Sequence, residues 1–181
     1  MSLDLRSSKL LDLVDSEAQV EQIGTGCLFT EGPIWNAEGN FLLFSDIPAD
    51  QIKMWTPYSG ITTFRQPSGQ SNGLTYDKQK RLLACEHANR RVSRTELDGT
   101  VTTLVSHYEG KKLNSPNDIV VKSDGSIYFT DPPYGLKAEY GEEGGAELDF
   151  QGVYRLSADG QQLTLLVDDF ERPNGLCFSP D

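Results

Sequence analysis

The phrase Asn72-Gly73-Leu74-Thr75-Tyr76 occurs, in varied form, four times along this chain of 181 residues. The other copies are Glu31-Gly32-Pro33-Ile34-Trp35, Asn117-Asp118-Ile119-Val120-Val121 and Asn174-Gly175-Leu176-Cys177-Phe178. Successive copies begin 41, 45 and 57 residues apart (31 to 72, 72 to 117 and 117 to 174). Repetition at such periods is typical of solenoids and propellers, in which one small unit is stacked many times. The sequence therefore predicts a repeat protein.

Each complete repeat is predicted to contain four short antiparallel strands, because apolar runs alternate with turn residues such as the Asp98-Gly99 pair. The predicted strands are 31–36, 40–46, 51–56 and 60–65 in the first repeat, and 72–77, 81–86, 90–97 and 100–106 in the second. Four strands in about 40 to 45 residues form one blade of a β-propeller. The expected fold class is therefore all-β, and the expected architecture is a propeller.

Residues 1–181 are expected to be the N-terminal part of a single propeller domain. Within it, residues 1–20 are expected to be a tail or a short helix, residues 21–29 a strand that closes the ring by completing the last blade, and residues 31–181 the blades. About three blades and the first strand of a fourth are thus present, whereas propellers typically have four to eight blades. The sequence therefore predicts a truncated propeller.

The third repeat carries an insertion at about residues 132–150, between its second and third strands. Its acidic side chains stand among glycines and are Glu139, Glu142, Glu143, Glu147 and Asp149. This composition favours a solvated surface loop. The alternative is a lid over the mouth of the channel, because long loops in compact domains often have a functional role.

Equivalent positions of stacked repeats face the same way, so the first residues of the four phrases are predicted to form a ring at one end of a central channel. These residues are Glu31, Asn72, Asn117 and Asn174. Several amide oxygens and one carboxylate suit a hard divalent cation such as calcium, with water at the remaining positions. The alternative for each Asn-Gly pair is an ordinary turn.

Further polar residues recur at or near the ends of the predicted second strands, and they are interpreted as strand-end caps: Asp46, Glu86 and Asp131. The rigid segment of residues 130–135 is predicted to set Tyr134 near the mouth of the channel. The two histidines, His87 and His107, are interpreted as surface or hydrogen-bonded residues rather than catalytic bases.

The composition limits the classes of partner. A net charge of −11, from 27 acidic and 16 basic residues, argues against nucleic acid. Neither a signal peptide nor an apolar run of about 20 residues is found, so a soluble, cytoplasmic protein without a membrane partner is expected. The three cysteines are far apart and form no Cys-x-x-Cys pair, so buried reduced thiols are expected.

Four motifs together resemble the gluconolactonase branch of the family that also contains senescence marker protein (regucalcin) and luciferin-regenerating enzyme. They are Glu31-Gly32-Pro33-x-Trp35, Ser115-Pro116-Asn117-Asp118, Thr130-Asp131-Pro132-Pro133-Tyr134-Gly135 and Arg172-Pro173-Asn174-Gly175-Leu176. The resemblance implies a six-bladed propeller with a divalent cation in its channel, usually Ca²⁺, with Mg²⁺, Mn²⁺ or Zn²⁺ as alternatives. It also implies the hydrolysis of sugar lactones.

Carried over by matching motif, Glu31 and Asn174 would be metal ligands, and Asn117 would be either a ligand or the holder of a metal-bound water and of the substrate. Asn72 and Tyr134 are further candidate substrate-binding residues. The remaining metal ligand of the family, an Asp in a later blade that is also a candidate base or nucleophile, would lie beyond residue 181, so the catalytic residue is unassigned.

The expected function is therefore calcium-dependent hydrolysis of a small-molecule lactone by the full-length protein, with the 181 residues alone inactive. A calcium-binding or ligand-sensing propeller without turnover is one alternative, and a phosphotriesterase or esterase that uses the same metal is another. Ser115 stands where regucalcin-type members have an Arg, so recognition of sugar hydroxyls is expected to differ. The lactone and the oligomeric state stay open.

Overall fold

A computed structural model describes residues 6–179, and three four-stranded antiparallel sheets dominate it. The first sheet contains β1 (Thr30–Asn36), β2 (Phe41–Asp46), β3 (Gln51–Thr56) and β4 (Gly60–Arg65). The second contains β5 (Ser71–Tyr76), β6 (Leu82–Glu86), β7 (Arg91–Thr95) and β8 (Val101–Val105). The third contains β11 (Ile119–Val121), β12 (Ile127–Thr130), β13 (Val153–Leu156) and β14 (Leu163–Val167).

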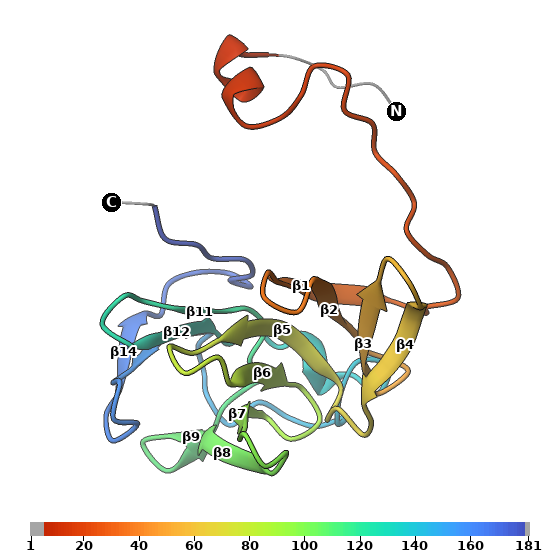
Figure 1. Cartoon of the computed structure of the whole chain (residues 1–181). Helices are drawn as coiled ribbons and strands as arrows, with labels where there is room; N and C mark the ends of the chain where they lie inside the picture. The colour runs from red at the N-terminus through yellow and green to blue at the C-terminus, as the bar shows by residue number, and fades with distance from the viewer. Residues whose placement is uncertain (1–5, 180–181) are drawn as a thin grey trace.

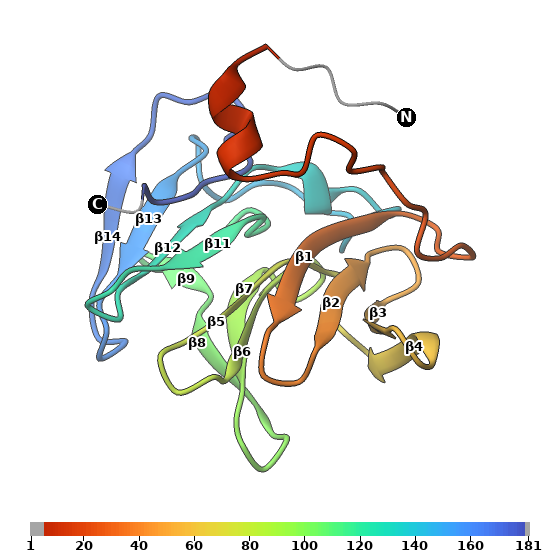
Figure 2. The same cartoon turned by 45° about the horizontal axis from the view of Figure 1, so that its top comes forward.

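The strands of each sheet pair in chain order, and the three sheets fan out side by side like blades (Figures 1 and 2). The prediction of an all-β, propeller-like fold is thereby confirmed, as are the strands of the first two repeats to within about two residues. A small hairpin, β9 (His107–Tyr108) with β10 (Lys111–Lys112), links the second blade to the third.

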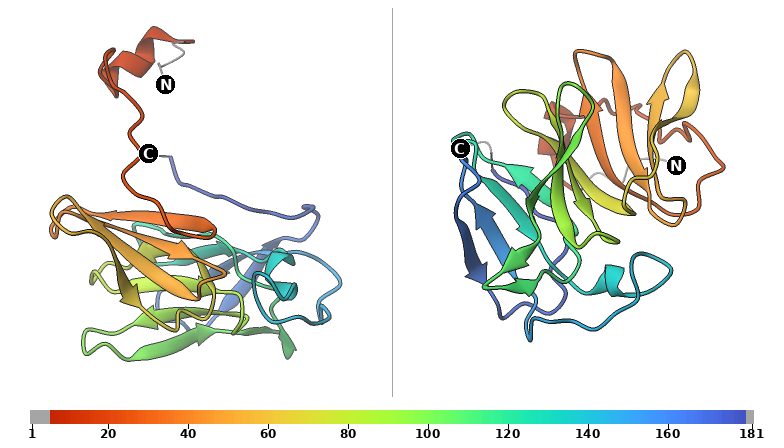
Figure 3. Two further views of the ribbon diagram at one scale, coloured as in Figure 1. Left: turned by 90° about the vertical axis from the view of Figure 1, so that its right-hand side faces the viewer. Right: turned by 90° about the horizontal axis from the view of Figure 1, so that it is seen from below.

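Two short 3₁₀ helices complete the described structure: η1 (Ser8–Asp12) and η2 (Tyr134–Leu136). Helix η1 lies within the segment for which a tail or a short helix was expected, and residues 1–5 of that segment lie outside the described residues. Helix η1 and the chain just after it lie away from the blades, as Figure 3 shows, whereas residues 22–28 lie along the first blade.

Two predicted strands are not formed. Residues 21–29 have no ladder partner within residues 6–179, although the N–H groups of Leu28 and Phe29 donate to Asp46 Oδ1, both at 3.1 Å. Ring closure by this segment stays a prediction. Residues 174–178 are also not a strand. There Leu176 N donates to Asp118 Oδ2 at 3.0 Å, but a ladder needs a neighbouring strand, and the described residues supply none.

The apolar core lies between adjacent blades. One cluster joins β2 and β3 of the first blade to β5 and β6 of the second through Leu43, Ile52, Leu74, Leu82 and Ala84. A second cluster joins the second and third blades, and its largest fully buried side chains are Phe129 and Tyr154. Full burial of an apolar side chain such as Phe129 stabilises the fold by about 1.5–3 kcal/mol, so packing between adjacent blades holds the three sheets together.

Buried acidic groups at the ends of the second strands fix the main chain and the neighbouring blade. Glu86 is 1% exposed and accepts hydrogen bonds from Arg65 of the first blade at 3.1 Å and from Arg91 at 2.7 Å. Asp131 accepts from Asn114 N at 2.7 Å, and burial raises the pKa of Asp131 to about 7. Together with Asp46, they have the structural role expected of strand-end caps.

The three cysteines are free thiols. Cys85 is buried, as expected, but Cys27 is half-buried and Cys177 is exposed, because neither lies in a paired strand. Within residues 6–179, no helix has the length and apolar character needed to cross a membrane.

Candidate functional site

The four repeated phrases meet one another. A Cβ atom at Gly32 would lie 2.0 Å from the carbonyl oxygen of Asn72, and one at Gly73 would lie 2.5 Å from that of Asn117. Gly73 N donates to Asn117 O at 2.7 Å. In the third phrase Asp118 replaces the glycine, and its carboxylate accepts from Leu176 N of the fourth phrase. Each phrase thus contacts the next through its second residue, as blades around one axis require.

The Asn residues of the phrases are held by the second strands of the blades. Ser45 Oγ at the end of β2 donates to the carbonyl oxygen of Asn72 at 2.7 Å. Asn117 N donates to Thr130 O, the last residue of β12, at 2.8 Å. These bonds occupy the main chains of Asn72 and Asn117 and leave their side-chain amides available.

A cavity of about 310 Å³ opens where the phrases meet, and we call it the donor cavity. The residues that line it are Phe29, Glu31, Ile47, Asn72, His87, Asn117, Tyr134, Tyr140 and Asn174. The structure therefore brings together all five residues singled out from the sequence: Glu31, Asn72, Asn117, Tyr134 and Asn174. What each of them binds stays a prediction.

The donor set fits a hard cation. Within residues 6–179, no hydrogen bond occupies the side chains of Glu31, Asn72, Asn117 or Asn174, so their oxygens are free to face a ligand. Asn72 and Asn117 are only 7% and 4% exposed, whereas Glu31 and Asn174 lie open to solvent. No three His, Cys, Asp or Glu side chains of the described chain gather as metal ligands. A cation here would be held by one carboxylate, amide oxygens and water, which is a calcium-like set.

The acidic insertion also reaches the donor cavity. Its acidic side chains are exposed, although Glu147 also accepts a hydrogen bond from Lys112 N at 2.8 Å, and Tyr134 and Tyr140 line the cavity wall. The ring of Tyr140 lies 5.5 Å from that of Phe29, which belongs to the segment before β1. Asn114 ties the two ends of the insertion together by donating to Asp131 O and Phe150 O at 3.1 and 3.0 Å. The insertion is therefore part of the site, which favours the alternative of a lid.

His87 is the cavity residue that sequence reasoning set aside. It is 1% exposed and hydrogen-bonded, as the sequence interpretation allowed, but it also lines the cavity. Its position directly after the end of β6 indicates that it lies near the cavity. Ser71, which precedes Asn72, pairs with Glu86, so the residue after Glu86 lies at the same end of the blade.

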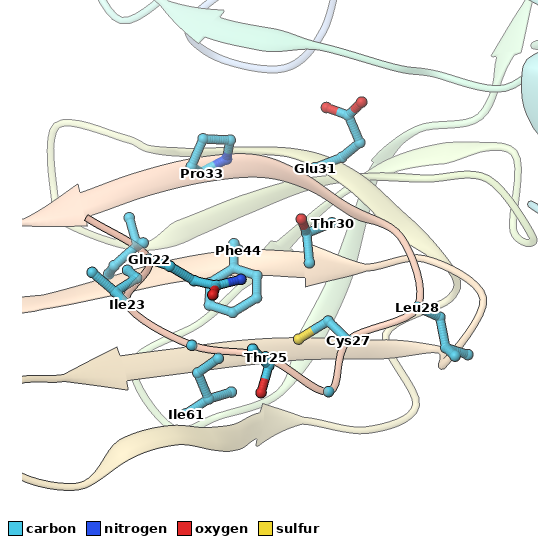
Figure 4. Close-up of a pocket in the computed structure, with 13 residues that line it drawn as sticks. Gln22, Ile23, Thr25, Cys27, Leu28, Thr30, Glu31, Pro33, Phe44 and Ile61 are labelled. Carbon is cyan, nitrogen blue, oxygen red and sulfur yellow. The ribbon is translucent and has the colours of Figure 1, made fainter. Parts of the chain in front are cut away.

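A second cavity, of about 720 Å³, lies between residues 22–28 and the first blade, and Figure 4 shows it. It is larger than the donor cavity, and its wall mixes apolar side chains such as Phe44 and Ile61 with polar ones such as Gln22. The carboxylate of Glu31 points away from Phe44 and Cys27 in this view. Among the described residues, the larger cavity is lined by the first blade and the segment before it alone, whereas the donor cavity joins residues of all four phrases, so the donor cavity is the better candidate site.

Comparison with known proteins agrees with this geometry. Residues 29–181 match the model of the SMP-30/gluconolactonase/LRE-like region. The chain is 36% identical to the gluconolactonase of Zymomonas mobilis over 97% of its own length and 52% of that protein. It therefore spans about half the length of this relative.

Solved structures show the same likeness. A gluconolactonase from Xanthomonas campestris matches with a TM-score of 0.81 and 40% identity, over 85% of this chain and 52% of that one. Regucalcin from Agrobacterium tumefaciens, described as a calcium-binding protein, matches with a TM-score of 0.64 and 18% identity, over 87% of this chain and 49% of that one, and shows the fold alone. The chain belongs to the SMP-30/gluconolactonase/LRE-like family.

Proposed function

We propose that the protein hydrolyses a sugar lactone in the donor cavity with the help of a divalent cation, Ca²⁺ in the first instance and Mg²⁺, Mn²⁺ or Zn²⁺ as alternatives. One observation carries the proposal: the oxygen-bearing residues of four separate repeats line one cavity without side-chain partners in the described chain. The likeness to gluconolactonases supports the choice of substrate class.

Glu31, Asn117 and Asn174 would hold the cation through side-chain oxygens. When bound, the cation supplies electrophilic polarisation of the lactone carbonyl. An amide whose oxygen is engaged still has two N–H donors, so Asn117 can also orient the lactone. Asn72 and the phenol of Tyr134 add further donors on the same wall. The insertion, through Tyr134 and Tyr140, would exclude bulk water from the bound lactone.

The finer expectations belong to this proposal. We propose a ring of six blades, of which these residues form about half, and a catalytic Asp outside them. The chain covers 52% of the Zymomonas protein and 52% of the Xanthomonas protein, which supports this proposal. The described cavity contains one carboxylate, that of Glu31, and a residue that holds a cation is a poor proton acceptor. The 181 residues alone are therefore expected to be inactive.

The test is proton release from D-glucono-1,5-lactone in a pH-stat, measured on the longest polypeptide that the gene encodes and on the 181-residue chain. Loss of release on chelation and its return with Ca²⁺ would support the proposal. A rate that chelation leaves unchanged would contradict the role of the cation. Hydrolysis of a phosphotriester but not of the lactone would favour the alternative chemistry on the same metal.

A second candidate is a calcium-binding or ligand-sensing propeller without turnover. The absence of a second carboxylate from the donor cavity within residues 6–179 favours it, because binding needs no proton acceptor. Calcium binding by titration calorimetry, without lactone hydrolysis above the spontaneous rate in the longest polypeptide, would favour this candidate over the lactonase.

A further inference from the structure

The side chain of His87 lines the donor cavity but has no role in the proposed reaction. Its main chain is fixed at the end of the second blade, where His87 N donates to Gln70 O at 3.3 Å and His87 O accepts from Arg90 N at 3.1 Å. The ring is almost fully buried and lies in the wall of the donor cavity.

The hydrogen bond of His87 fixes its tautomer. Nδ1 lies 2.9 Å from the carbonyl oxygen of Tyr140, which can only accept, so Nδ1 carries the proton. Nε2 of the neutral ring is then a pure acceptor. Burial lowers the pKa of His87 to about 4, so this neutral form dominates near pH 7.

No partner within residues 6–179 satisfies Nε2, although it is buried. A buried polar atom without a partner costs about 1–3 kcal/mol, so such atoms are rare and call for an explanation. Because His87 lines the donor cavity, a hydrogen-bond donor on a bound ligand would account for this unpartnered acceptor. Carbonyl and ring oxygens of a lactone only accept, whereas its hydroxyl groups donate.

The hydroxyl group of Ser115, which lies beside the imidazole of His87, already has hydrogen-bond partners within the protein. Ser115 Oγ donates to Pro132 O and accepts from Gly135 N at 2.9 Å, so its hydroxyl anchors the turn before η2. Gly135 in turn packs on the imidazole, since a Cβ atom there would lie 2.5 Å from Cβ and Cγ of His87. Ser115 and Gly135 thus hold the ring in place, and His87 is left to contact the ligand.

We propose that His87 Nε2 accepts a hydrogen bond from a hydroxyl group of the bound lactone, which makes the donor cavity selective for hydroxylated lactones. This inference rests on the proposed lactonase function. A general base is a poorer assignment, because Nδ1 bonds a carbonyl and not a carboxylate, and burial disfavours the imidazolium that a base must become more than this bond favours it.

Two substitutions of His87 distinguish the contribution of Nδ1 from that of Nε2. His87→Asn places an amide N–H near the position of Nδ1, so the bond to Tyr140 O can persist while the acceptor at Nε2 is lost. His87→Gln places an amide oxygen near the position of Nε2 and keeps an acceptor there. His107→Asn is the matched control, because His107 is exposed on β9 and its ring bonds only Ser106 Oγ within the described chain.

The measurement is kcat/KM for D-glucono-1,5-lactone and for δ-valerolactone, which has no hydroxyl group, on the longest polypeptide that the gene encodes. For His87→Asn we expect kcat/KM for gluconolactone to fall about tenfold, the value of one hydrogen bond, and that for δ-valerolactone to change less than twofold. His87→Gln should recover most of the loss, and His107→Asn should match the wild type.

Equal losses for both lactones would overturn the inference, because a base or a merely structural residue affects both alike. A tenfold loss of Ca²⁺ affinity in His87→Asn would also overturn it, by making Nε2 a metal ligand. If the wild type hydrolyses neither lactone, the proposed function fails. The hydroxyl contact is then tested separately, by comparing the affinities of wild type and His87→Asn for 1,5-anhydro-D-glucitol. Weaker binding by His87→Asn would support the hydroxyl contact, and unchanged binding would refute it.

Discussion

Substitution of Gly73 by Ala tests the contact between successive repeats. An added Cβ atom would lie 2.5 Å from Asn117 O and 2.7 Å from the Cα atom of Asp118, and both are main-chain atoms that cannot rotate away. Relief requires a shift of several tenths of an ångström between β5 and β11. That overpacking costs about 1–3 kcal/mol, and the strained Gly73 N to Asn117 O bond adds about 0.5–1.5 kcal/mol.

The lower chain entropy of Ala in the unfolded state offsets about 0.4–1 kcal/mol of this loss. The expected net fall in the free energy of unfolding is thus about 2–3 kcal/mol, measured by urea denaturation. Gly145→Ala is the control, because a Cβ atom at Gly145 meets nothing within 4 Å, and its stability should be unchanged or slightly raised. Equal stabilities of Gly73→Ala and wild type would refute the close approach of the repeats.

Two further predictions concern the effect of the buried ionisable side chains of His87 and Glu86 on stability. The folded pKa of His87, about 4, is below its usual value near 6.5, so on acidification the unfolded chain takes up this proton first and stability falls. Urea unfolding should show a loss of about 2 kcal/mol from this group between pH 7.5 and pH 5. The loss should be absent in His87→Gln and present in His107→Gln; the same pH dependence in all three proteins would contradict it. Glu86→Gln leaves Arg65 and Arg91 without their buried carboxylate, so we expect a loss of about 3–5 kcal/mol in thermal or urea unfolding. A loss below 1 kcal/mol would show that these ion pairs contribute little.

The sequence predicts the parts of this fold that depend on local patterns. Strand alternation and turn residues locate the blades, and the repeated phrase predicts which residues come together, because equivalent positions of equivalent units must face one axis. All five candidate residues accordingly reach the donor cavity. Residues 21–29 and 174–178 have strand-like patterns, but a strand needs a partner, and pattern alone does not supply one.

The role of His87 was not predictable in the same way. Its burial and its tautomer depend on Tyr140 and Gly135, about 50 residues further along the chain in an irregular insertion. Contacts of an irregular loop follow no period, so no pattern in the sequence indicates them. The acidic composition of the insertion predicts its exposed face, and the rigid segment of residues 130–135 predicts the place of Tyr134, but neither indicates that Tyr140 lines the cavity.

The most direct test of the account is the position of the cation. Crystals of the longest polypeptide that the gene encodes, grown with Mn²⁺ in place of Ca²⁺, would locate the ion by its anomalous scattering. The account predicts one peak in the donor cavity, within coordination distance of oxygen atoms of Glu31, Asn117 and Asn174. A cavity without a peak at millimolar Mn²⁺, or an ion bound elsewhere, would contradict it.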